Sequence, residues 1–115
     1  MHEEMLRRLD TLADSDNAFE VELFQIFLSE LEKNLAALEE ACEGGDLEKA
    51  ARESHSLKGS ALNVGANRFS QLCEQLEIGL KAGKDEPGLR KAMAEEYHSL
   101  AKALNARLET LLGDL

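Results

Sequence analysis

Ser-His-Ser-Leu-Lys-Gly-Ser-Ala-Leu-Asn-Val-Gly, residues 54–65, is the most informative segment of this sequence. The segment is typical of a helix, but it contains Gly59, and a glycine inside a helix costs about 1 kcal/mol relative to alanine. His55 precedes Gly59 by four residues and Lys58 by three, and residues at these spacings lie on one face of a helix. We therefore expect an imidazole, an ammonium group and a position without a side chain to form one patch.

Apolar and small residues recur at helical spacing around this segment and predict one buried helix face. They are Leu47, Ala50, Ala51, Ser54, Leu57, Ala61 and Val64. His55 falls at the edge of this stripe. We therefore expect its imidazole to be accessible to solvent.

The chemistry of these residue types suits a phosphoryl group held on the ring of His55. Imidazole can form a covalent intermediate by nucleophilic attack, and its ordinary pKa near 6.5 leaves a large neutral fraction at cellular pH. The ammonium of Lys58 is placed to neutralise phosphoryl oxygens. Gly59 lacks the Cβ that would crowd a second protein approaching the histidine.

At these positions the sequence resembles the histidine-containing phosphotransfer domain of phosphorelays. The matching residues are His55, Leu57, Lys58, Gly59, Ser60, Ala61 and Gly65, followed by Cys73 and Leu76. The family domain is a helical bundle of about this size, so the resemblance extends to nearly the whole chain. The residues specific to it lie between positions 54 and 77.

The resemblance implies roles for individual residues. His55 would be the phosphoacceptor, Lys58 the partner of the phosphate, and Gly59 the clearance for an incoming receiver domain. Glu77 occupies a position where some family members have a glutamine that hydrogen-bonds the imidazole. An acidic group there would orient the ring and raise its basicity, and it would also repel the phosphate. Ser54 replaces the alanine that often precedes the histidine.

A docking surface for partner proteins is expected around the histidine. Besides His55 and Gly59 it would include Ala51, Arg52 and Leu62 of the same helix, and Glu74, Glu77 and Lys81 on the shoulder of the next helix. The partners implied by the resemblance are receiver domains of response regulators and a hybrid sensor histidine kinase.

The function predicted is that of a covalent phosphoryl carrier, which takes a phosphoryl group from the aspartate of one receiver and passes it to another. The sequence contains no glycine-rich nucleotide loop, so we do not expect an enzyme with its own kinase machinery. The Mg²⁺ that phosphoryl transfer requires would come from the receiver, and this chain would bind no cofactor. The alternative is a helical interaction module that docks a kinase or receiver without transferring phosphate.

The whole chain of 115 residues is expected to form one all-α domain, an antiparallel up-down four-helix bundle with a short extra helix at the N-terminus. The sequence is rich in strong helix formers, and 4% of it is aromatic. Predicted helices cover about 2–13, 17–42, 47–63, 67–81 and 86–112. Capping residues are expected at Asp14, Ser15 and Asp16 before the second helix and at Asp46 before the third.

The net charge of −10 argues against binding to nucleic acid or to an anionic membrane surface. The acidic excess lies in residues 1–46, which hold 13 acids and 3 bases, whereas the remainder is balanced. The sequence has no signal peptide, apolar run of membrane-spanning length or lipidation motif, so we expect a cytoplasmic protein. We also expect a monomer.

A metal site is not expected. Glu95 and His98 form one Glu-x-x-His pair of the kind found in di-iron bundles, but such sites need two pairs and further glutamates. Cys42 and Cys73 lie on apolar stripes too far apart in sequence for a metal-binding pair. We interpret both cysteines as small buried apolar residues.

Overall fold

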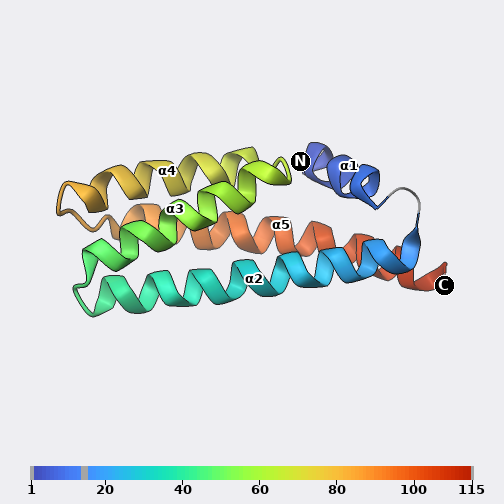
Figure 1. Cartoon of the computed structure of the whole chain (residues 1–115), viewed down its shortest axis with the longest axis horizontal. Coiled ribbons are helices and arrows are strands. Elements are labelled where there is room, and N and C mark those ends of the chain that lie inside the picture. Colours follow the sequence, from blue (N-terminus) through green and yellow to red (C-terminus); the bar gives the residue numbers. More distant parts are fainter. Residues whose placement is uncertain (1, 14–15, 115) are drawn as a thin grey trace.

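Five α-helices account for most of the computed structural model, which describes residues 2–13 and 16–114. They are α1 (Glu3–Leu12), α2 (Asn17–Glu43), α3 (Leu47–Asn63), α4 (Asn67–Lys81) and α5 (Pro87–Gly113), shown in Figure 1. Each helix begins and ends within one or two residues of its predicted bounds. The predicted caps at positions 14 and 15 lie outside the described residues. Asp16 is the N-cap of α2 and accepts a hydrogen bond from the backbone N–H of Phe19 at 3.1 Å.

Helices α2 to α5 form an antiparallel up-down bundle in which each helix packs beside the one that precedes it (Figure 1). Helix α5 closes the bundle because it contacts both α4 and α2. Short connections allow this arrangement, since residues 44–46, 64–66 and 82–86 are all that separates consecutive helices. The predicted fold class is thereby confirmed.

The helices of the bundle differ in length, and this difference explains the position of α1. Helices α2 and α5 have 27 residues each, whereas α3 has 17 and α4 has 15. At 1.5 Å per residue, the longer pair therefore extends beyond the shorter pair by roughly 15 Å. Helix α1 lies beside this extension (Figure 1), and its Met5 and Leu9 are fully buried there. The prediction of a short helix covering one end is correct.

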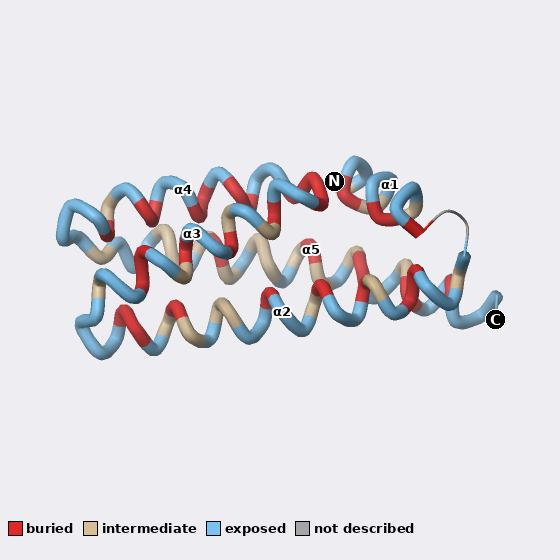
Figure 2. The backbone as a smooth tube through the Cα atoms, in the orientation of Figure 1, coloured by how far each residue is buried: buried red, intermediate tan, exposed pale blue. Residues whose placement is uncertain are grey.

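The core runs along the inward faces of all five helices (Figure 2). Its largest fully buried side chains are Met5, Leu9, Phe24, Leu31, Leu38, Leu57, Phe69, Leu76, Met93, Leu100 and Leu104. The apolar residues near the start of α2 do not all face the core. Val21 and Phe27 are buried and Leu23 is partly buried, but Ile26 is exposed.

Helices α2, α3 and α4 end in the same kind of turn. A glycine with a positive φ follows each helix, and the residue after the turn donates a backbone hydrogen bond to a carbonyl near the helix end. At the end of α3 the glycine is Gly65, with φ of 75°, and Ala66 donates to the carbonyl of Ala61 at 2.9 Å. Gly65 is also covered by α1, because an added Cβ would lie 3.0 Å from Cδ of Arg8.

Candidate functional site

His55 lies in the middle of α3, on the edge that faces α4. Its side chain is 65% exposed, as the periodicity of the sequence predicts. The neighbouring positions Ser54 and Leu57 belong to the buried face and fix the rotation of the helix about its axis. The imidazole is thus held at the surface by residues that pack in the core.

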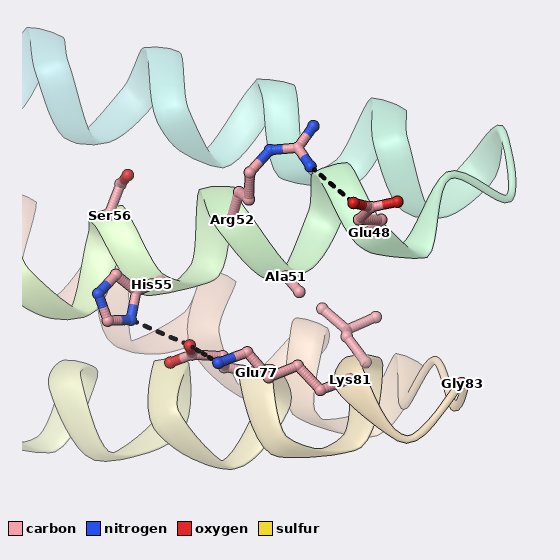
Figure 3. Close-up of a pocket in the computed structure, with 9 residues that line it drawn as sticks. Glu48, Ala51, Arg52, His55, Ser56, Glu77, Lys81 and Gly83 are labelled. Carbon is pink, nitrogen blue, oxygen red and sulfur yellow. Dashed lines mark hydrogen bonds and ion pairs between the residues drawn. The ribbon is translucent and has the colours of Figure 1, made fainter.

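Glu77 of α4 holds one nitrogen of the imidazole. Its Oε2 is 3.0 Å from Nδ1 of His55, and its side chain is only 5% exposed (Figure 3). Glu77 thus makes the contact with the imidazole that the resemblance implies for position 77, but as a buried side chain rather than as part of an exposed docking surface. The 3.6-residue period places position 77 at the boundary of the apolar face, and the close packing of α3 against α4 then covers it.

Two ammonium groups share the carboxylate of Glu77. Nζ of Lys58 lies 3.1 Å from Oε1, and Nζ of Lys81 lies 2.9 Å from Oε2. Burial by itself raises the pKa of Glu77, but hydrogen bonds from Lys81, Lys58 and His55 outweigh it and lower the pKa to about 2. Glu77 is therefore a carboxylate at neutral pH despite its burial.

The ionised state of Glu77 determines the tautomer of His55. A carboxylate can only accept hydrogen bonds, so Nδ1 of the ring must donate its N–H to Glu77. In the neutral ring the lone pair then resides on Nε2. Figure 3 shows this second nitrogen directed away from Glu77. The nucleophilic atom of the site is therefore Nε2.

The side chain of Lys58 is more buried than its position on the helix suggests. Its side chain is 23% exposed and its ammonium is bound to Glu77. The predicted cluster of His55, Lys58 and Gly59 therefore exists, but the buried carboxylate joins two of its members. Lys81, which was predicted only as part of a docking surface, is a third group in direct contact with Glu77.

Gly59 is exposed, and a Cβ added to it would meet no atom within 4 Å. Packing within the chain therefore does not require a glycine here. Its φ also lies outside the positive range in which glycine is favoured. This is consistent with a glycine that leaves room for another molecule. Leu62, one turn further along α3, is an exposed apolar side chain.

An open groove of about 730 Å³ extends from His55 toward the end of α4 (Figure 3). Its lining residues are Glu48, Ala51, Arg52, His55, Ser56, Glu77, Leu80, Lys81 and Gly83. Four of the predicted docking residues, Ala51, Arg52, Glu77 and Lys81, contribute to this groove. Leu62 and Glu74 are exposed but do not line it.

Ser54 has a structural role that sequence reasoning did not assign. Its hydroxyl is fully buried and donates a hydrogen bond of 2.7 Å to the backbone carbonyl of Cys73 in α4. This bond joins α3 and α4 one residue before His55 and four residues before Glu77. It fixes the relative position of the two helices where the site requires it. In the sequence, the signal for this buried hydrogen bond is a serine inside an otherwise apolar stripe.

The other candidate chemistry of the sequence finds no support in the described residues. No group of three His, Cys, Asp or Glu side chains is arranged to hold a metal ion among residues 2–13 and 16–114. Both cysteines are buried, and burial raises the pKa of Cys42 to about 11 and that of Cys73 to about 12. Neither thiol is therefore ionised at neutral pH. Within the same ranges, no helix is long and apolar enough to cross a bilayer.

Fold and site together define a small helical bundle whose chemistry depends on one accessible, oriented histidine. The Hpt domain family matches residues 22–114, and the chain belongs to this family. This confirms the resemblance seen in the sequence. The matched region contains α3, α4 and α5 and most of α2, and it leaves out α1.

Two individual proteins are similar to this chain. The phosphorelay intermediate protein YPD1 of Candida albicans is 28% identical over 67 residues, which make up 58% of this chain. The match covers 36% of that relative, so the chain spans about a third of its length. The crystal structure of histidine-containing phosphotransfer protein B from Pseudomonas aeruginosa PAO1 superimposes with a TM-score of 0.82. It covers 90% of this chain and 92% of the other at 24% identity, which supports the fold.

Proposed function

We propose that this protein carries a phosphoryl group on Nε2 of His55, accepts it from the aspartyl phosphate of a receiver domain and passes it to another receiver. Membership of the Hpt domain family supports histidine phosphotransfer as the class of function. The observation that carries the proposal is the contact between Nδ1 of His55 and Glu77, because it leaves Nε2 as the nucleophile on an exposed ring.

The transfer is a displacement at phosphorus. The lone pair of Nε2 forms the new N–P bond while the P–O bond to the aspartate of the receiver breaks, and that aspartate leaves as a carboxylate. The proton on Nδ1 stays in place, so the phosphorylated ring carries a positive charge. The carboxylate of Glu77, 3.0 Å away, compensates this charge. This gives a glutamate a specific advantage over a neutral glutamine at position 77.

Lys58 and Lys81 stabilise the phosphoryl oxygens in this proposal. Both ammonium groups lie within 3.1 Å of Glu77, which itself touches the ring, so both are within one side-chain movement of the phosphoryl group. Lys81 is the more exposed of the two and has the greater freedom to turn toward the phosphate. Glu77 thus holds two ammonium groups close to the acceptor nitrogen.

The partner must complete the reaction. Phosphoryl transfer depends strongly on a metal ion and on charge clamps. We infer that a receiver domain docks over His55, where it occupies the groove and the open space beside Gly59. The receiver brings Mg²⁺ with its aspartyl phosphate. A hybrid sensor kinase is the expected source of the phosphate, and the cytoplasm is the expected location. Within the carrier, the chemistry is confined to one covalent intermediate.

Incubation with phosphorylated receivers and Mg²⁺ tests the proposal. The protein should acquire a label that is lost in acid and kept in base, as expected for a phosphoramidate. His55→Gln should abolish this label, whereas His98→Gln, which changes an exposed histidine of α5, should retain it. Label that persists in His55→Gln would show that another residue is the acceptor. Binding of receivers without any labelling would favour the docking module instead.

A further inference from the structure

A second cluster of ionisable groups lies at the end of the bundle where α2 begins and α5 ends. Three helices contribute to it, with Asp10 from α1, Glu20 from α2 and Arg107 from α5. A nitrogen of the Arg107 guanidinium donates to Oδ2 of Asp10. Glu20 is 3% exposed and lies beside a cavity of about 350 Å³, which Asp10 and Arg107 also line. The cluster takes no part in the phosphotransfer site.

The hydrogen bonding of this cluster is incomplete. Oδ1 of Asp10, Oε2 of Glu20 and Nε of Arg107 are buried and have no hydrogen-bond partner within the described part of the chain. Two carboxylates cannot bond to each other, because each can only accept. A proton on one of them supplies the missing donor, and a hydrogen bond from Glu20 to Asp10 then satisfies an oxygen of each.

Electrostatics favours the same arrangement. Burial, and after it the neighbouring Asp10, raise the pKa of Glu20 to about 7, and Arg107 opposes the shift. Asp114, which follows α5, also faces the cavity, whereas Asn17 and Thr110 contribute only neutral groups. Arg107 is ion-paired with Asp10, and the carboxyl groups of Glu20 and Asp114 line the same cavity. The excess of negative charge makes the second ionisation unfavourable.

The two halves of α1 are attached differently. In the first half, His2 is hydrogen-bonded to Ser99, Glu4 accepts from Asn67, and Met5 is buried. The second half contains Asp10, which accepts a hydrogen bond from Arg107 of α5, and it is also held by the buried Leu9 and by Arg8, which donates to the carbonyl of Leu62. Any change in the charge of the cluster therefore acts on the second half of α1.

We propose that Asp10, Glu20 and Arg107 form a proton-dependent latch that holds α1 against α2 and α5. With one proton shared between the two carboxyl groups, all three side chains pair across the helices. Loss of that proton leaves two buried carboxylates beside one guanidinium, and their repulsion releases the second half of α1. The latch therefore opens as the pH rises through neutrality.

A titration of the full chain tests the latch. The carboxyl carbon of Glu20, followed by ¹³C NMR between pH 4 and pH 9, should titrate near pH 7. Hydrogen-exchange protection factors in α1 should fall by about tenfold or more between pH 5.5 and pH 8, since one unit of pKa corresponds to a tenfold change in population. Protection in α3 and α4 should change much less.

Matched variants separate the latch from a general effect of pH. Glu20→Gln supplies a permanent N–H donor and should keep α1 protected at every pH, as should Asp10→Asn if the first variant does not fold. Glu22→Gln changes an exposed glutamate of the same helix and should keep the pH dependence. A midpoint near 4.5 for Glu20, or unchanged pH dependence of α1 in both cluster variants, would overturn the proposal.

Discussion

At position 77, a single carboxylate contacts an imidazole and two ammonium groups. Its oxygens lie 2.9 to 3.1 Å from nitrogens of His55, Lys58 and Lys81. A glutamine could accept the hydrogen bond from Nδ1, but it could not neutralise the lysines or balance a phosphorylated ring. The residue that departs from the resemblance is therefore the one that organises the charges of the site.

Substitution of Glu77 should separate orientation from charge. We expect Glu77→Ala to slow phosphorylation of His55 by roughly 10- to 100-fold, by analogy with the loss seen when the hydrogen-bonding partner of a metal-ligating histidine is removed. Glu77→Gln should lose less rate, because its amide oxygen still orients the ring. Single-turnover transfer from a phosphorylated receiver measures both effects. Glu74→Gln, an exposed change on α4, is the control, and equal rates for Glu77→Ala and wild type would contradict the orienting role.

Glu77 should also make the stability of the folded protein depend on pH in the acidic range. Its pKa is lowered from an ordinary 4.5 to about 2 in the folded protein, so its contribution to the free energy of unfolding is complete above about pH 4.5. That contribution is lost as the pH falls through 4.5 toward 2. Urea unfolding at several pH values should therefore give a smaller slope of stability against pH in Glu77→Gln than in wild type below pH 4.5. Identical slopes would show that the ion pairs do not stabilise the fold.

At the scale of helices, Gly59 and Gly65 are glycines for different structural reasons. Gly59 has open space around it, whereas Gly65 has a φ of 75° and lies under Arg8. The sequence identifies both positions, but only the structure distinguishes a glycine required by the backbone from one that leaves a surface open.

The two glycines should respond in opposite ways to alanine. Gly59→Ala should raise the free energy of unfolding by up to about 1 kcal/mol, because alanine favours the helix and its Cβ meets nothing. Gly65→Ala should lower it by about 1–2 kcal/mol, the cost of a left-handed conformation for an L-residue. Chemical denaturation measures both. Gly59→Glu should fold but accept phosphate poorly. Normal transfer in that variant would contradict the proposal that Gly59 leaves space for a docking receiver.

The sequence predicted the helices and the cluster on α3 well, because both depend on local spacing. The patch of His55, Lys58 and Gly59 follows from positions i, i+3 and i+4 of one helix. The burial of Glu77 depends instead on how α3 and α4 are aligned, which the bond from Ser54 to Cys73 fixes across 19 residues. The Asp10 cluster joins three helices and was not predicted, since no local pattern relates its members.

In the molecule as a whole, different helices form the two ends of the bundle. The cluster of His55, Lys58, Glu77 and Lys81 belongs to α3 and α4, whereas α1 packs on the extensions of α2 and α5. The Hpt domain match begins at residue 22 and so excludes α1. Helix α1 therefore lies outside both the matched region and the cluster around His55.

Removal of residues 1–13 should test this independence. The shortened protein should unfold at a lower temperature, because the loss of Met5 and Leu9 exposes the apolar faces that they cover on the longer helices. Its rate of phosphorylation at His55 should stay within about threefold of the full chain, since no residue of α1 contacts Glu77 or its partners among the interactions described here. A loss of phosphorylation in a folded truncated protein would show that α1 belongs to the site.

The short connection between α3 and α4 has a consequence for how this site tolerates insertions and deletions. Acceptor, counter-charge and both lysines are encoded within residues 55–81, and the two helices are joined by only three residues. One residue added inside α4 before position 77 would rotate that carboxylate by about 100° around the helix and away from the ring. Length changes in the connection from α2 to α3 or from α4 to α5 would leave the pairing intact, so the spacing of 22 residues from His55 to Glu77 is the one that the site requires.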